Sequence, residues 1–224
     1  FAEVLLNEKA QASGEQRRDY VGLILKAGRQ LLALVTDTLD FAELEAGRVR
    51  FVPDDVPIAD LLDDAVAMMM PIAKDRAVTL AIAGTPDRIP AVRADRRRLL
   101  QILTNLLSNA VKYNVPGGHA TVSAAVAEQG WVRIAVEDTG RGIPAERQAE
   151  VFEPFNRLGA EARTIEGTGI GLTICRRLIL RMGGRIGFES RVGQGSRFWV
   201  LLPAAEGAPQ DQAPLDDEPI RERA

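Results

Sequence analysis

The sequence predicts an α+β protein: a two-layer α/β sandwich with helices on one face of its sheet, preceded by a helical hairpin. Helix-like and strand-like hydrophobic periods alternate loosely between residues 49 and 203. The last two predicted strands, residues 185–190 and 197–202, follow each other directly, which favours helices gathered on one face. Before residue 49 the apolar spacing changes to that of a coiled coil.

The heptad pattern before residue 49 predicts a long amphipathic helix. Its seam residues recur at alternating spacings of four and three, and they are Tyr20, Ile24, Ala27, Leu31, Leu34, Thr38 and Phe41. Residues 1–8 read as the end of a preceding helix, and residues 10–16 as the connecting loop, with Ser13 as a candidate cap. A helix with such a seam needs a partner, so residues 1–48 are predicted to form a hairpin.

The sandwich of residues 49–203 is predicted from local periodicity. It begins with a strand at 49–52, a helix at 57–75 and a strand at 78–82. A helix at 96–113 and a strand at 131–137 follow, and His119 heads a further strand. His119 is the only histidine and is expected at the surface without a chemical role.

The helix at 96–113 carries the first group of candidate site residues. Asp95 is a good N-cap, and one apolar stripe is formed by Leu99, Ile102, Leu103, Leu106 and Ala110. Asn105, Asn109 and Lys112 share a different face, since they stand at positions i, i+4 and i+7. Two amides and a lysine could hold a metal-bridged polyphosphate, because Mg²⁺ prefers oxygen ligands and takes few from protein. The alternative is an ordinary solvated helix face.

A turn after the strand at 131–137 carries the second group. Val132, Ile134 and Val136 share one face of that strand. Asp138 stands at its end, and Gly140 and Gly142 allow a tight turn where backbone can approach a flat ligand. A plain Asp-Thr-Gly turn would look the same.

A glycine-rich segment opens the last predicted helix. Gly167, Gly169 and Gly171 let backbone amides converge on phosphate at a helix N-terminus. The apolar face that follows is Leu172, Cys175, Leu178 and Ile179. The spacing is neither a Rossmann fingerprint nor a Walker A loop. The polar stretch 156–166 before it has few apolar anchors.

Four blocks in this order, NLLSNAVKYN, DTGRGIP, FEPFNR and GTGIGL, resemble the nucleotide site of the sensor histidine kinases, within the GHKL (Bergerat-type) ATPase group. The resemblance implies a Bergerat ATP-binding fold with ATP and Mg²⁺ as cofactors. It implies that Asp138 accepts the exocyclic amine of adenine, that Asn109 ligates the metal, and that residues 156–166 form an ATP lid. The implied catalytic residues are Asn105, Lys112 and Arg157. The implied nucleotide-binding residues are Asn105, Asn109, Lys112, Tyr113, Asp138, Gly140, Gly142, Ile143, Phe155, Arg157, Gly167, Thr168, Gly169, Ile170, Gly171 and Leu172. The block GQGSRF, residues 193–198, is similar to the family's final glycine turn and supports only the fold.

Residues 17–48 resemble the second helix of the dimerisation and histidine-phosphotransfer hairpin of these kinases. The resemblance implies a homodimer through a four-helix bundle and a response-regulator receiver domain as partner. The family's acceptor histidine would stand ahead of Phe1, outside this sequence. Either an upstream segment is missing or the protein is a truncated relative.

Three functions stay open. The first is the catalytic core of a sensor histidine kinase, which phosphorylates a histidine and relays the phosphoryl group to an aspartate. The second is a GHKL-type ATPase, but such relatives place a glutamate where this chain has Asn105, and an amide cannot activate water. The third is a non-catalytic ATP-binding scaffold.

Composition narrows the partners. The net charge of −3 gives no footprint for nucleic acid. The single cysteine, Cys175, excludes an internal disulfide and fits a core position in a reducing compartment. No apolar run approaches the roughly 18 residues of a membrane span. We therefore expect no membrane contact of this segment and a cytoplasmic location, with any membrane anchor lying upstream. Residues 204–224, rich in Ala, Pro, Asp and Glu, are expected to form a flexible tail or linker.

Overall fold

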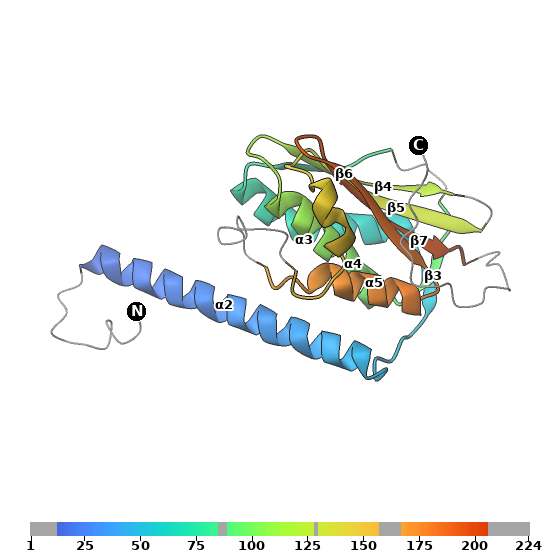
Figure 1. Cartoon of the computed structure of the whole chain (residues 1–224), viewed down its shortest axis with the longest axis horizontal. Helices are drawn as coiled ribbons and strands as arrows, with labels where there is room; N and C mark the ends of the chain where they lie inside the picture. The colour runs from blue at the N-terminus through green and yellow to red at the C-terminus, as the bar shows by residue number, and fades with distance from the viewer. Residues whose placement is uncertain (1–12, 85–88, 128–129, 157–166, 206–224) are drawn as a thin grey trace.

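The computed structural model describes residues 13–84, 89–127, 130–156 and 167–205, which form a long helix docked on an α/β sandwich (Figure 1). The helices are α2 (Gly14–Glu45), α3 (Ile58–Asp75), α4 (Arg96–Lys112), the 3-10 helix η1 (Ala145–Glu150) and α5 (Gly171–Arg181). The strands are β1 (Asp54–Val56), β2 (Thr79–Ile82), β3 (Val92–Ala94), β4 (His119–Val126), β5 (Trp131–Asp138), β6 (Arg185–Arg191) and β7 (Gly195–Pro203).

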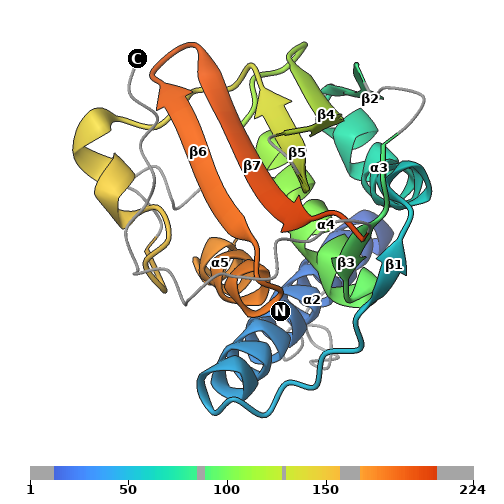
Figure 2. The same ribbon diagram turned by 90° about the vertical axis from the view of Figure 1, so that its right-hand side faces the viewer.

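The main sheet has five strands in the order β2-β4-β5-β7-β6, and only the β2–β4 pair is parallel. Val136 of β5 stands opposite Val122 of β4 and Phe198 of β7, and all three are buried. Helices α3, α4 and α5 cover this face of the sheet (Figure 2). The prediction of a two-layer α+β sandwich with helices on one face is therefore confirmed.

Helix α4 lies at the centre of the core. Four leucines on its buried side, Leu99, Leu103, Leu106 and Leu107, are at most 2% exposed. Asp95 caps the helix, because its Oδ1 accepts a hydrogen bond from the backbone N–H of Arg98 at 3.1 Å. The helix ends one residue earlier than predicted, with Tyr113 as its C-cap.

One strand prediction is wrong, and one short strand was not predicted. Residues 49–52 do not form a strand, because the N–H of Val52 bonds to the second carboxylate oxygen of Asp95 at 3.0 Å and Val49 turns into the core. The strand instead comprises residues 54–56 as β1, paired antiparallel with β3. The sequence analysis missed β3, since three residues are too few to show a period of two.

Helix α2 begins earlier than predicted. Ser13 and Gln16 form a capping box, in which the Ser13 hydroxyl accepts from the Gln16 N–H and the Gln16 side chain accepts from the Ser13 N–H. The predicted cap is correct, but the helix starts at Gly14, so the loop does not extend to residue 16. The predicted end of a preceding helix at residues 1–8 lies outside the described residues. No helix in the described part of the chain is both long and apolar enough to cross a membrane.

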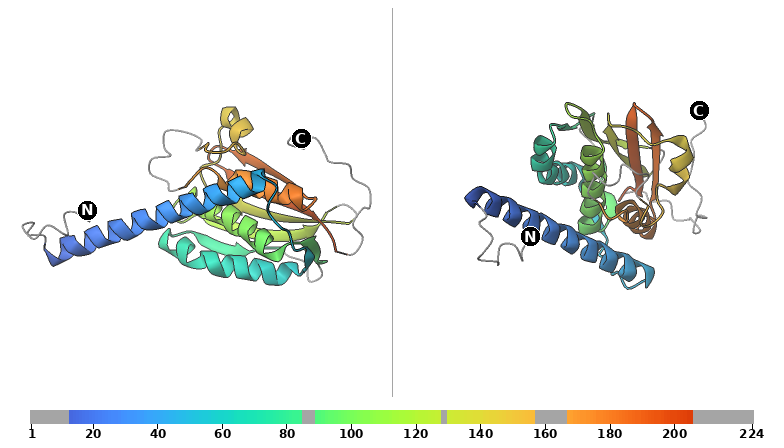
Figure 3. Two further views of the ribbon diagram at one scale, coloured as in Figure 1. Left: turned by 90° about the horizontal axis from the view of Figure 1, so that it is seen from below. Right: turned by 60° about the vertical axis from the view of Figure 1, so that its left-hand side comes forward.

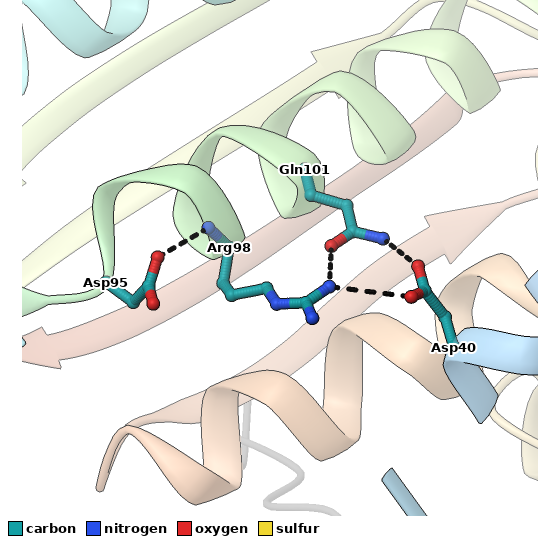
Figure 4. A network of polar contacts seen from close by, with 4 residues as sticks. All are labelled: Asp40, Asp95, Arg98 and Gln101. Atoms are coloured by element: carbon teal, nitrogen blue, oxygen red, sulfur yellow. Dashed lines mark hydrogen bonds and ion pairs between the residues drawn. The ribbon is translucent and has the colours of Figure 1, made fainter. Parts of the chain in front are cut away.

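The C-terminal half of α2 runs beside α5, while its N-terminal half extends past the sandwich (Figure 3). A polar network joins α2 to α4: Asp40 accepts a hydrogen bond from Gln101 at 2.8 Å and lies 3.6 Å from the guanidinium of Arg98 (Figure 4). Arg98 also donates to Gln101 at 2.9 Å. These contacts fix which side of α2 faces the sandwich.

One residue of the predicted seam lies on this docked side. The guanidinium of Arg177 stacks over the ring of Phe41 at 4.5 Å, and Phe41 also makes an edge contact with Phe155 at 6.3 Å between ring centroids. The upstream seam residues Leu31 and Leu34 are 62% and 42% exposed. The seam therefore divides, with Phe41 packed against the sandwich and the leucines presented outward.

Candidate nucleotide site

The polar face of α4 meets the glycine-rich segment at its Asn105 end. Asn105, Asn109 and Lys112 are half-buried, as expected for a face that is neither core nor free surface. The backbone of Gly171 lies directly against the amide of Asn105, so that a Cβ at Gly171 would overlap its oxygen and nitrogen. A side chain at this position would displace the Asn105 amide, so glycine allows the close approach that brings the first and fourth sequence blocks together.

The Asp138 turn meets the other end of α4. The backbone carbonyl of Tyr113 accepts a hydrogen bond from the N–H of Arg141 at 3.3 Å. Asp138 is only 8% exposed, and its Oδ1 accepts from the Gly140 N–H at 2.8 Å. Burial raises the pKa of Asp138 above its ordinary 3.8, although the N–H groups of Gly140 and Ser196 act in the opposite direction. A buried carboxylate at a tight turn is suited to receive a neutral hydrogen-bond donor.

The third block borders the fourth. The backbone of Phe155 and Asn156 lies beside Gly169. Phe155 is 59% exposed and has a left-handed backbone with φ of 62°, an unusual conformation for a bulky residue. Its exposed ring is free to contact a ligand as well as Phe41. Arg157, predicted in the same block, lies outside the described residues.

The remaining predicted residues lie in different environments. Ile170 is fully buried and Leu172 packs against the core, so for Ile170 only the backbone is available to a ligand. The hydroxyl of Thr168 is occupied by Asp37 of α2, to which it donates at 2.7 Å. Gly142 and Ile143 are held by the β6–β7 hairpin, as described below. Gly167 is exposed at the edge of the site.

The sequence analysis missed the contribution of α2 to this site. Asp37 contacts Thr168 across 131 positions of sequence, and Phe41 contacts Phe155 across more than a hundred. No local pattern signals such pairs, because the apolar spacing predicts only that Asp37 and Phe41 lie on a helix and does not identify the residues that they contact.

A cleft of about 1310 Å³ lies elsewhere, between η1, α5 and the β6–β7 hairpin. Its walls include Phe152, Arg176, Leu180 and Phe188, and Asp138 is the only one of the predicted site residues described by the structure that it reaches. The candidate nucleotide site is therefore defined by converging motifs and not by this cleft.

The donor set of the site fits a magnesium ion bound chiefly through a nucleotide. Among the described residues no cluster of three His, Cys, Asp or Glu side chains could hold a metal alone. The half-buried amides of Asn105 and Asn109 make no side-chain hydrogen bond to another described residue, so the Asn109 oxygen is available as a single protein ligand. Magnesium is commonly bound by one or two protein groups with phosphate and water.

Comparison with known proteins agrees with this arrangement. Residues 94–206 match the profile of the family described as histidine kinase-, DNA gyrase B-, and HSP90-like ATPase. The chain therefore belongs to this ATPase family. Its relatives there include the sensor protein GacS of Pseudomonas syringae pv. syringae, 38% identical over 190 residues, and the sensor protein DivL of Caulobacter vibrioides, 36% identical over 206 residues. The predicted resemblance to sensor histidine kinases is thus confirmed.

The chain is only part of the length of these relatives. The alignments cover 82% and 92% of this chain but 21% of GacS and 26% of DivL. Among solved structures, full-length ShkA in complex with AMPPNP is 36% identical with a TM-score of 0.75, covering 95% of this chain and 43% of that one. The shared part is therefore the α2 helix with the sandwich.

Proposed function

We propose that this chain binds Mg-ATP and is the catalytic core of a sensor histidine kinase. The observation that carries the proposal is the convergence of the motif blocks around α4, which itself contains the first block. The fourth block meets α4 through Gly171 and Asn105, the second through Arg141 and Tyr113, and the third borders the fourth at Gly169. The AMPPNP complex of ShkA, a relative in both sequence and structure, supports an adenine nucleotide as ligand.

Each block has a role in this proposal. The Asp138 carboxylate accepts the exocyclic amine of adenine, and it rejects guanine, whose carbonyl would leave the buried carboxylate unpaired. The amides of the glycine-rich segment and the N-terminus of α5 receive the phosphates. Lys112 and Arg157 place positive charge near them. Asn109 holds the magnesium ion, which when bound neutralises charge on the phosphates.

The identity of Asn105 favours transfer to a protein side chain over hydrolysis. An amide has no basic lone pair at neutral pH and cannot take a proton from water. Asn105 instead orients the phosphates by hydrogen bonding. The GHKL-type ATPase is therefore the weaker candidate, and the non-catalytic ATP-binding scaffold is the reading that remains if no acceptor histidine is phosphorylated.

The wider assembly follows from the same proposal. Residues 1–48 pair with a second copy through a four-helix bundle, and residues 49–203 bind nucleotide. The tail or linker predicted for residues 204–224 begins later than predicted, because Ala204 is buried and the N–H groups of Ala204 and Ala205 donate to the carbonyls of Gly130 and Ala91, both at 2.7 Å. The exposed apolar residues of α2, which include Leu31, Leu32 and Leu39, provide a surface for that bundle. A response-regulator receiver domain accepts the phosphoryl group in the cytoplasm, with no part for nucleic acid or a membrane contact of this segment.

Labelling with γ-labelled Mg-ATP tests the proposal. The present chain should bind ATP, yet it should neither label itself nor hydrolyse ATP quickly, because His119 is its only histidine. Protein that also carries a segment with an acceptor histidine ahead of Phe1 should acquire an acid-labile, alkali-stable label. Fast ATP turnover by the present chain would support the ATPase instead, and an unlabelled longer protein would support the scaffold.

A further inference from the structure

The loop between β5 and η1 is held from outside the nucleotide motifs. This loop contains Gly142 and Ile143, and the turn between β6 and β7 lies across it. A Cβ at Gly142, whose φ is +69°, would overlap the carbonyl oxygen of Arg191. The Gly193 N–H also donates to the Arg141 carbonyl at 2.8 Å. The two loops are therefore in direct backbone contact.

Ser190 of β6 holds the N–H of Ile143. Its hydroxyl oxygen accepts that N–H at 2.8 Å and donates its single proton to the Gly195 carbonyl at 3.0 Å. The Ser196 hydroxyl lies 2.9 Å from the same oxygen and must be the donor in that contact, because Ser190 has no second proton. Ser190 thus uses its one donor and both acceptor positions, which fixes its orientation.

Gln148 of η1 holds the opposite side of Ile143. Its Nε2 donates to the Ile143 carbonyl at 3.1 Å and to the Ser190 carbonyl at 3.0 Å. Both protons of the Gln148 amide are therefore used, one on Ile143 and one on Ser190. Between them, Ser190 and Gln148 satisfy the N–H and the C=O of Ile143.

The same hairpin also supports Asp138. Ser196 stands opposite Asp138 in the β5–β7 pairing, and its backbone N–H is one of the groups that lower the pKa of the Asp138 carboxyl. One serine pair, Ser190 and Ser196, therefore connects Asp138 with Ile143. These are the two ends of the turn that the proposed function assigns to adenine.

We infer that Ser190 and Gln148 are positioning residues that set the shape of the adenine subsite. The inference rests on the proposed function for the identity of the ligand. Neither side chain needs to touch the nucleotide. They hold Ile143 in place, so that the base enters a preformed turn without the cost of ordering it.

The test compares Ser190→Ala and Gln148→Met with Ser190→Thr, which keeps the hydroxyl. Ser123→Ala in β4 is the matched control, a serine of the same sheet outside the turn. Calorimetry with adenosine and with Mg-ATP should show a loss of about tenfold for both ligands in the first two variants, the effect of losing buried hydrogen bonds. Ser190→Thr should restore the affinity, and melting temperatures show that each variant is folded.

Three results would overturn the inference: unchanged adenosine affinity in both Ser190→Ala and Gln148→Met, a larger loss for ATP than for adenosine, or the same loss in Ser123→Ala. Hydrogen exchange of the Ile143 amide without nucleotide gives a second readout. The exchange rate of this amide should rise in Ser190→Ala and return to the wild-type value in Ser190→Thr. Wild-type protein that binds no adenosine would refute the proposed function, and the exchange rate alone would then decide whether Ser190 positions the loop.

Discussion

The hydroxyl of Thr168 donates a hydrogen bond of 2.7 Å to the carboxylate of Asp37, and so connects the glycine-rich segment of the candidate site with helix α2. The same hydroxyl accepts the N–H of Ile170 at 3.3 Å. Beside this contact, Phe41 packs against Phe155, and Arg177 forms an ion pair with Glu45. In this conformation, two residues of the nucleotide motifs are engaged by the helix that carries the heptad seam.

We expect substitution of Asp37 to raise ATP affinity. The Asp37 carboxylate lies next to the segment proposed to bind phosphate, so Asp37→Asn should strengthen binding about two- to fivefold at low salt, and less at high salt. Asp37→Ala also removes the acceptor for Thr168, so any additional gain in that variant measures the hydrogen bond. Glu43→Gln, an exposed substitution on the same helix, is the control. Affinity that is unchanged in both Asp37 variants at low salt would contradict this prediction.

Asp138→Asn should weaken ATP binding by roughly 1–3 kcal/mol, because a pure acceptor becomes a mixed group in a buried hydrogen bond. The preference for ATP over GTP should narrow in the same variant, since guanine no longer faces an unpaired carboxylate. Calorimetric titration with both nucleotides measures the two effects. A folded variant with unchanged affinity and unchanged selectivity would remove Asp138 from the site.

The raised pKa of Asp138 predicts a pH dependence of stability. The native state holds the Asp138 proton more tightly than the unfolded state does, so this group stabilises the fold fully below pH 3.8 and loses that contribution as the pH rises through the native pKa. The free energy of unfolding of wild type, relative to Asp138→Asn, should therefore fall as the pH rises above 3.8. Urea denaturation of both proteins at several pH values measures the difference.

ATP affinity should depend on pH in the opposite sense. Acidification protonates Asp138 and spoils the acceptor for the amine, so wild type should lose affinity in the acidic range. Asp138→Asn serves as the control for titration of the nucleotide itself and should lose less. Parallel pH profiles for the two proteins would show that Asp138 does not titrate in the binding site.

Asn109→Ala should distinguish binding of the metal from binding of the adenine base. If the Asn109 oxygen ligates magnesium, the substitution should weaken Mg-ATP binding far more than adenosine binding, since the Asp138 turn is untouched. Phosphoryl transfer in the longer protein should fall with it. Equal losses for adenosine and Mg-ATP would mean that α4 itself is disturbed, which circular dichroism would show independently.

Asp95→Ala should destabilise the sandwich by about 1–2 kcal/mol, the range for loss of an N-cap. The Asp95 carboxylate accepts hydrogen bonds from two backbone N–H groups, those of Arg98 and Val52. The start of α4 and the extended segment before β1 therefore both depend on it. Asp95→Asn keeps one acceptor oxygen and should lose less. The midpoint of urea denaturation measures the effect, and equal losses in both variants would show that the carboxylate charge and not the cap matters.

The sequence determined the local chemistry of this protein. The spacing of Asn105, Asn109 and Lys112 on one helix, and the alternation that ends at Asp138, are short-range patterns, and backbone geometry translates such patterns directly into faces and turns. The helix boundaries of α3 and α4 followed within one residue for the same reason. Ser13 and Asp95 were recognisable as caps because capping involves neighbours only three positions away.

Only the tertiary structure decided what lies beside each local element. The Thr168–Asp37 contact, the hydrogen bond from Ile143 to Ser190, and the diversion of Val52 to Asp95 join residues 43 to 131 positions apart. Phe41 carried the same heptad signal as Leu31, yet one packs against the sandwich and the other points outward. Such choices depend on which surfaces become adjacent when the chain packs, and a periodic pattern contains no information about the partner of a face.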